Sequence, residues 1–253
     1  MYALVTGATS GIGYELAKIL AQNNYNLILV GRREDRLKDI EKELSDKHNI
    51  KVVGYKCDLA DLTQIKSLIE FVKSYEDISV VINSAGYGKM GYLHEINEND
   101  DVDMITTNII SLHLINKHFS NTMKKGHIVN IASIAGTAPT PYMSQYGATK
   151  AYVYSFSRAI NYEMKKLKKD VHVMVACPGP VDTEFHDRAN SSFKLKSISA
   201  SKCAQIIYKA MKKKKSKVMV SFPIKCAYVA LKLAPSCITL PVEYKMQTKK
   251  NGI

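Results

Sequence analysis

The sequence predicts an α/β fold in which a parallel sheet is covered by helices on both faces. Short apolar runs of strand length alternate with longer segments whose apolar residues recur every three or four positions. The strand-like runs are continuously apolar, which is typical of strands buried on both faces. The chain has 253 residues, and this length fits one large domain better than two small ones.

The expected elements follow in regular order along the chain. Strands are predicted at Leu4–Thr6, Asn26–Val30, Lys51–Cys57, Val80–Asn83, His127–Ser133, Val171–Cys177 and Lys217–Phe222, all rich in valine, isoleucine or leucine. Helices are predicted at Gly11–Gln22, Arg36–Ser45, Leu62–Ser74, Asp100–Met123, Tyr142–Leu167 and Ala200–Met211. Such alternation gives right-handed crossovers and a doubly wound, Rossmann-type sheet of about seven strands. We expect one domain over residues 1–253.

Composition narrows the class of protein. The hydrophobic content is 46%, and no apolar run is long enough for a transmembrane helix. The N-terminus has glycines where a signal peptide would have its apolar segment, so we expect a cytoplasmic protein. The five cysteines are scattered without a CxxC pair, so neither disulfides nor a metal site is expected.

The net charge of +13 raises the question of an anionic partner. The lysines cluster at Lys165–Lys169, Lys212–Lys217 and Lys249–Lys250, and no aromatic residues alternate with them to stack on bases. We interpret these clusters as solvated helix ends and expect no nucleic-acid partner. A positive field would still favour an anionic cofactor.

A glycine-rich loop joins the first strand to the first helix. Glycines at a strand-to-helix turn let a pyrophosphate approach the backbone, and the helix N-terminus supplies N–H donors and positive charge. A glycine loop alone could be a structural turn, but its position between strand and helix favours a dinucleotide site. The expected binding residues are Gly7, Thr9, Ser10, Gly11, Ile12 and Gly13.

The second strand ends in Gly31, Arg32 and Arg33, where an NAD-binding fold usually carries an acidic residue. A guanidinium binds a 2′-phosphate through charge-assisted hydrogen bonds, whereas a carboxylate would repel it. NADP(H) is therefore the expected cofactor, with Arg32 favoured over Arg33. The alternative is that both arginines only face water. Further cofactor contacts are expected at the ends of the third and fourth strands, from Asp58, Leu59, Asn83, Ala85 and Gly86.

A catalytic group is predicted at the end of the fifth strand and on the following helix. Tyr146 and Lys150 are four residues apart and share a helix face, which points toward the strand end at Ser133. A carbonyl that accepts hydride needs a proton donor, and a nearby ammonium moves the pKa of a phenol toward neutrality. Ser133 can hydrogen-bond the same oxygen. Asn108 could hold a water that connects Lys150 to solvent.

These features together resemble the classical branch of the short-chain dehydrogenase/reductase family over about residues 1–190. The matching motifs are TGATSGIG at 6–13, NSAG at 83–86 where the family usually has NNAG, Asn108, Ser133, YGATK at 146–150 and PGPVDT at 178–183. The resemblance implies catalytic roles for Asn108, Ser133, Tyr146 and Lys150, with Tyr146 and Lys150 also contacting the cofactor. It implies that Pro178, Gly179, Val181 and Thr183 line the nicotinamide.

The sequence thus predicts an NADP(H)-dependent oxidoreductase that interconverts a ketone or aldehyde and an alcohol. The alternative is a catalytically silent, NADP(H)-sensing regulatory protein, which would have no need of the serine, tyrosine and lysine together. The resemblance further favours a homodimer or homotetramer.

Substrate choice is expected to depend on residues 184–198, together with the loops Tyr87–Leu93 and Ile134–Met143. Candidate pocket residues, which favour a moderately hydrophobic carbonyl compound, are Tyr92, Pro139, Tyr142, Phe185, His186 and Phe193. The C-terminal extension, residues 223–253, contains an apolar, helical segment at Cys226–Ala234. We expect a packed terminal helix there, ahead of an interface with another subunit, and membrane contact is the least favoured use.

Overall fold

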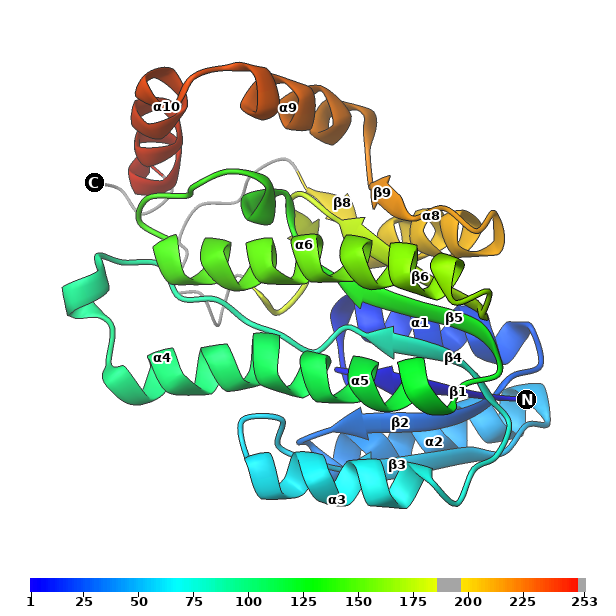
Figure 1. Ribbon diagram of the computed structural model, residues 1–253. Coiled ribbons are helices and arrows are strands. Elements are labelled where there is room, and N and C mark those ends of the chain that lie inside the picture. Colours follow the sequence, from blue (N-terminus) through cyan, green and yellow to red (C-terminus); the bar gives the residue numbers. More distant parts are fainter. Residues whose placement is uncertain (186–196, 250–253) are drawn as a thin grey trace.

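A seven-stranded parallel sheet forms the centre of the computed structural model, which describes residues 1–185 and 197–249 (Figure 1). Its strand order is β3-β2-β1-β4-β5-β6-β9. The strands are β1 Tyr2–Thr6, β2 Asn26–Gly31, β3 Val52–Lys56, β4 Ile78–Asn83, β5 Lys125–Ile131, β6 Asp170–Cys177 and β9 Lys217–Met219. Strand β1 pairs with β2 on one side and with β4 on the other. The strand order reverses there, which is where doubly wound sheets bind ligands.

Helices cover both faces of the sheet, as the sequence predicts. The main ones are α1 Gly11–Gln22, α2 Glu34–His48, α3 Leu62–Val72, α4 Glu98–Ile105, α5 Leu112–Thr122, α6 Ser144–Lys166 and α8 Ala200–Lys212. One face packs against α1, α2 and α8, and the other against α3, α5 and α6 (Figure 1). Short segments complete the body: η1 Leu93–Glu95, η3 Ile134–Thr137, and the paired strands β7 Val181–Asp182 and β8 Ile198–Ser199.

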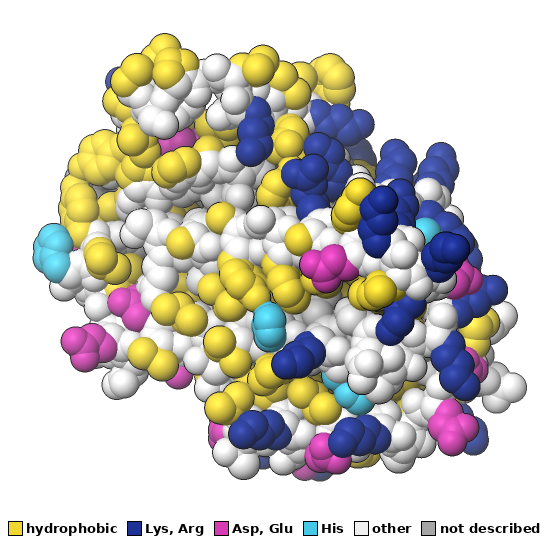
Figure 2. Space-filling view, in the orientation of Figure 1, with side chains coloured by type: hydrophobic (Ala, Val, Ile, Leu, Met, Phe, Trp, Pro, Cys, Tyr) yellow, Lys and Arg dark blue, Asp and Glu magenta, His cyan; other side chains and the backbone are white. Residues whose placement is uncertain are grey.

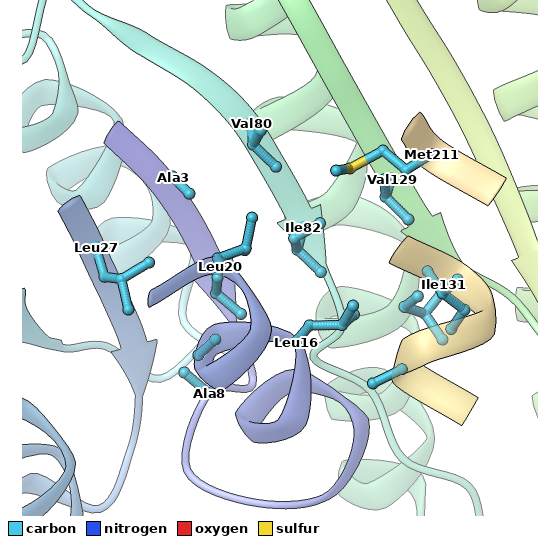
Figure 3. Packing of buried hydrophobic residues seen from close by; sticks show 14 of the residues in the cluster. Ala3, Ala8, Leu16, Leu20, Leu27, Val80, Ile82, Val129, Ile131 and Met211 are labelled. Carbon is cyan, nitrogen blue, oxygen red and sulfur yellow. The ribbon is translucent and has the colours of Figure 1, made fainter. Parts of the chain in front are cut away.

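Alternate residues of each strand enter different cores. In β1, Val5 packs with Leu16 and Leu20 of α1, whereas Leu4 packs with helices of the opposite face. Figure 3 shows the first of these cores, where strand side chains such as Ile82 point toward α1 and α8. Burial on both faces explains why the strand sequences are continuously apolar. The two cores fix the sheet beneath the cavity described below.

Two expected elements differ in detail. The predicted helix Asp100–Met123 is helical throughout most of its length, but it contains a π-helical segment, η2 Thr106–Ser111, between α4 and α5. The predicted strand Lys217–Phe222 ends early, at Met219. Phe222 instead begins helix α9, in which Pro223 lies in the first turn, a position where proline's fixed φ favours a helix.

The C-terminal extension forms two helices, α9 Phe222–Leu233 and α10 Ser236–Lys249. They lie on the side of the molecule beyond the carboxyl end of β9 and the start of α6 (Figure 1). Within residues 1–185 and 197–249, no helix is both long and apolar enough to cross a membrane.

Candidate active site

A cavity of about 610 Å³ lies at the carboxyl edge of the sheet. Its walls come from the loops after β1, β2, β3, β4, β5 and β6, from α6, and from the two C-terminal helices. The sequence-predicted residues that line it are Gly7, Thr9, Ser10, Gly11, Ile12, Arg32, Arg33, Asp58, Leu59, Ala85, Gly86, Ser133, Tyr146, Lys150, Pro178, Gly179, Val181 and Thr183. Most of the expected cofactor residues therefore face one chamber together with Ser133, Tyr146 and Lys150.

The loop after β1 needs its glycines for conformation and for space. Gly7 and Gly11 have φ values of +66° and +56°, which other residues rarely adopt. A Cβ on Gly7 would lie 2.8 Å from the backbone nitrogen of Ala85, so any side chain there would press on the loop after β4. Helix α1 begins at Gly11, and its first N–H groups lie beside this loop. The geometry fits the pyrophosphate of a dinucleotide.

The two arginines after β2 are held differently. Arg33 donates to the carbonyl oxygen of Thr9 at 3.0 Å and forms a salt bridge with Glu184 at 3.1 Å. Arg32 is half exposed and lies 3.7 Å from a carboxylate oxygen of Asp58. A Cβ on Gly31 would lie 2.7 Å from the Thr9 methyl group, so a larger side chain at that position would require the Thr9 side chain to move. Both arginines therefore line the pocket beside the loop, and each lies near one carboxylate.

The predicted catalytic side chains come from α6 and from the end of β5. Tyr146 and Lys150 lie in the first two turns of α6, and both are buried. Lys150 Nζ donates to the backbone oxygen of Ile131 at 3.0 Å, and this bond connects α6 to the last residue of β5. The side chain of Ser133 caps the short helix η3 and hydrogen-bonds with Tyr146.

Burial shifts the two titratable groups in opposite senses. It raises the pKa of Tyr146 to about 12, and the hydrogen bond with Ser133 opposes this rise. It lowers the pKa of Lys150 to about 8. The structure does not show the expected lowering of the tyrosine pKa by the ammonium, because Lys150 Nζ is 5.7 Å from the Tyr146 ring centroid and bonds to Ile131 instead. Tyr146 is a protonated phenol at neutral pH.

Asn108 lies in the π-helical segment η2, behind the cavity wall rather than on its surface. Its Nδ2 group donates to the backbone oxygen of Tyr87 at 2.9 Å and to Thr149 Oγ1 at 3.0 Å. Its Oδ1 accepts from the backbone nitrogen of Tyr87 at 3.1 Å. A Cβ on Gly86 would be 2.9 Å from Asn108 Oδ1 and 3.0 Å from Lys150 Nζ, so this glycine keeps the space between the two groups open.

Two of the expected cofactor residues, Asn83 and Gly13, do not line the cavity within the described part of the chain. The Asn83 side chain turns into the interior and donates to Asn130 Oδ1 at 2.8 Å. Asn130 is bonded in turn to Asn116 and Ser157. A Cβ on Gly13 would clash with the backbone oxygen of Gly7. Both residues therefore support the loops of the site from behind.

The sequence-based pocket residues are only partly placed at the cavity. Phe185 lines it, with its ring 5.3 Å from that of Tyr146. Tyr92, Pro139 and Tyr142 do not line it, although all three are described. His186 and Phe193, like most of the predicted specificity segment 184–198, lie outside the described residues.

Sequence reasoning missed a large part of the cavity wall. The missed residues belong to the C-terminal extension and are Ile224, Ala227 and Leu231 of α9, and Glu243, Met246 and Gln247 of α10. Tyr87, Met90 and Met143, which also line the cavity near Tyr146, lie in the two loops that the sequence predicts to influence substrate choice. The α9 residues recur at helical spacing, which is the one signal that could have found them. No group of three or more His, Cys, Asp or Glu residues suited to a metal ion occurs in the described part of the chain.

Comparison with known proteins agrees with this architecture. Residues 1–194 match the model of the short chain dehydrogenase family. The chain is 35% identical over 191 residues to an NADP-dependent 3-hydroxy acid dehydrogenase of Schizosaccharomyces pombe, covering 72% of each chain. It is 32% identical over 187 residues to a 3-oxoacyl-acyl-carrier-protein reductase of Chlamydia muridarum, covering 72% of this chain and 75% of that one.

A solved structure, a short-chain dehydrogenase from Sphingobium yanoikuyae in complex with NADPH, is also similar. It superposes with a TM-score of 0.84 at 26% identity and covers 91% of this chain and 92% of its own. The matched motifs, the sheet order and the loop after β1 agree with one another. This chain belongs to the short-chain dehydrogenase family.

Proposed function

We propose that this protein is an NADP(H)-dependent oxidoreductase that interconverts a ketone or aldehyde and an alcohol, with Tyr146 as the acid/base. The observation that carries the proposal is the shared cavity, which brings Ser133, Tyr146 and Lys150 to the same chamber as the glycine loop. A dinucleotide with its pyrophosphate at the start of α1 would extend along that chamber toward Tyr146.

The preference for NADP(H) is supported by the charges beside the loop. Arg32 and Arg33 both line the cavity, and Gly31 stands where a fold that favours NAD usually carries an acidic residue. Among relatives, the fission yeast protein is NADP-dependent by name, and the Sphingobium enzyme was solved with NADPH. The bound cofactor supplies or accepts the hydride, and the protein handles the proton.

In the direction of reduction, Tyr146 donates a proton to the substrate oxygen as negative charge develops there. Its pKa of about 12 keeps the phenol protonated at neutral pH, as a donor requires. Ser133, which hydrogen-bonds with Tyr146, can also hold the carbonyl oxygen. Lys150, with a pKa of about 8, carries an ammonium at neutral pH and can resupply the proton that Tyr146 gives up.

Asn108 acts in this scheme as a positioning residue. Both hydrogens of its Nδ2 group are used, by the Tyr87 backbone oxygen and by Thr149. Its Oδ1 faces the space over Gly86 that Lys150 Nζ also borders. We propose that a water held there by Oδ1 returns protons to Lys150 from solvent.

The walls around Tyr146 favour a moderately hydrophobic carbonyl compound. Met90, Met143 and Phe185 pack about the tyrosine ring, and Ile224 and Leu231 of α9 line the same chamber. Apolar walls with a few convergent polar groups are typical of sites for small organic ligands.

The test is Tyr146→Phe, assayed by NADPH oxidation against a panel of ketones, aldehydes, steroids and acyl thioesters. Turnover should fall about a hundredfold or more, while NADPH binding measured by fluorescence stays within about twofold. Tyr154→Phe is the matched control, because Tyr154 is also a buried tyrosine of α6 but its hydroxyl bonds to Tyr228, 3.0 Å away.

Three outcomes are informative. Loss of turnover in Tyr146→Phe alone supports the proposal. Full turnover in Tyr146→Phe would show that Tyr146 is not the acid/base. NADPH binding without turnover of any compound in the panel would favour the catalytically silent, NADP(H)-sensing alternative.

A further inference from the structure

Helix α9 has two apolar faces on opposite sides. Ile224, Ala227 and Leu231 share one face and line the cavity. The opposite face presents apolar side chains to solvent at the spacing of a single helix stripe, formed by Phe222, Cys226, Val229 and Leu233. We call these four residues the outer stripe of α9. Phe222 is 74% exposed and Leu233 is 80% exposed, so the body of the protein leaves this stripe uncovered.

Helix α10 extends the apolar surface. Ile238 and Val242 lie four residues apart on it and are each about half exposed. Met246, one turn further on, lines the cavity and is also about half exposed. The helix is fixed to the body by a hydrogen bond between the hydroxyls of Tyr244 and Tyr92. Figure 2 shows hydrophobic side chains gathered over α10 and α9 at the top of the molecule. Large contiguous apolar patches of this kind mark interaction sites.

Lysines border this apolar surface, and their charge indicates what kind of partner can bind there. Lys225 and Lys232, seven residues apart, flank the outer stripe and are exposed. Residues 212–249 contain nine lysines and one glutamate, and Figure 2 shows basic side chains beside the α9 end of the apolar patch. A second copy of this chain docked there would bring like charges together, whereas an anionic lipid surface would neutralise them.

We propose that α9 and α10 bind the surface of an anionic lipid bilayer, with the outer stripe of α9 inserted among the headgroups. An apolar helix face flanked by lysines is the pattern of helices that lie in a bilayer interface. Neither helix is long enough to span, so the contact is peripheral. The opposite face of α9 lines the cavity. When the outer stripe contacts lipid, only this one helix separates the cavity from the bilayer surface.

The expected ranking of uses for the extension therefore changes. The sequence favours a packed terminal helix, and the structure shows packing on one face of α9. No residue of α9, which lies entirely within the described chain, is buried. The outer stripe is exposed, which no sequence pattern reveals, and this exposure makes lipid contact the favoured use of the extension.

The experiment is flotation of the full-length protein with vesicles of equal parts phosphatidylglycerol and phosphatidylcholine, and with vesicles of phosphatidylcholine alone. The wild type should float with the anionic vesicles at low salt, and high salt should weaken this binding. Leu233→Asp should lower the partition coefficient about tenfold, because it places a charge in the inserted stripe. Leu62→Asp is the matched control, since Leu62 is an exposed leucine at the start of α3.

A second pair of variants tests the charge. Lys225→Glu with Lys232→Glu should abolish binding to anionic vesicles, whereas Lys42→Glu with Lys47→Glu, on exposed positions of α2, should weaken it far less. Thermal unfolding checks that each variant is folded. No flotation of the wild type, or equal loss in the variants and their controls, would overturn the proposal. So would a change of molecular mass in Leu233→Asp with unchanged flotation, which would assign the face to a second copy.

Discussion

Helices α1 and α9 have the same length, twelve residues, and both are rich in apolar residues, yet their surroundings differ completely. Helix α1 packs on the sheet beside α8 and buries Leu16 and Leu20. Helix α9 contacts the body through one face and leaves Leu233 80% exposed. An apolar helix face can therefore become core, cavity wall or docking surface, depending on which parts of the protein pack against it.

The largest expected difference is in stability. Leu20→Ala in α1 should lower the free energy of unfolding by about 3 kcal/mol, because Leu20 is fully buried and truncation leaves a cavity. Leu233→Ala in α9 should change it by less than about 0.5 kcal/mol. Urea unfolding of both variants measures the contrast. Equal losses would mean that α9 is buried in solution, and the comparison would fail.

The contrast between these helices also shows how far sequence reasoning reaches. The sheet was predictable because burial on both faces imposes a local pattern, a continuous apolar run, on each strand. Tyr146 and Lys150 were predictable as a pair because helix periodicity fixes their common face. In both cases the signal is local in the chain.

The rest depends on contacts between distant segments. Asn83 turns inward because Asn130, 47 residues later, accepts its hydrogen bond. The raised pKa of Tyr146 follows from burial that the spacing of residues does not reveal. The strand at Lys217–Phe222 was predicted too long because the apolar run continues into α9, and only the packing of Ile224 over Gly179 shows where the chain turns away.

A smaller expected effect is a pH-dependent change in the free energy of unfolding at a buried lysine, which an exposed lysine should not show. Burial lowers the pKa of Lys150 to about 8 from 10.5, so between these values the unfolded chain binds more protons than the folded protein. The contribution of Lys150 to the free energy of unfolding should therefore rise as pH increases from about 8 to about 10.5 and stay level below about 8. The buried thiols of Cys57, Cys177 and Cys203, whose pKa values burial raises to about 12, act in the opposite sense above about pH 9, so the contribution of Lys150 is measured as a difference between variants. Lys150→Met should be more stable than the wild type by about 2 kcal/mol at neutral pH.

The difference in stability between Lys150→Met and the wild type should shrink as pH rises from about 8 to about 10.5. Lys232→Met, at an exposed position of α9, is the matched control and should follow the wild-type curve. Urea unfolding from neutral pH to pH about 10 measures all three proteins. A constant difference between Lys150→Met and the wild type would show that Lys150 is not held by a desolvating environment.

The smallest expected effect is on cofactor affinity, and it compares the loss of a positive charge beside the glycine loop with the loss of one on the C-terminal extension. Arg32→Ala should weaken NADPH binding about tenfold and leave NADH binding unchanged, because a guanidinium at the end of β2 can contact a 2′-phosphate. Arg33→Ala should weaken both cofactors, since Arg33 bonds to Thr9 in the glycine loop. Lys225→Ala on α9 removes the same charge at an exposed position of the extension and should change neither. Isothermal titration separates a direct contact from a general positive field, because a field would make the losses in Arg32→Ala and Lys225→Ala alike.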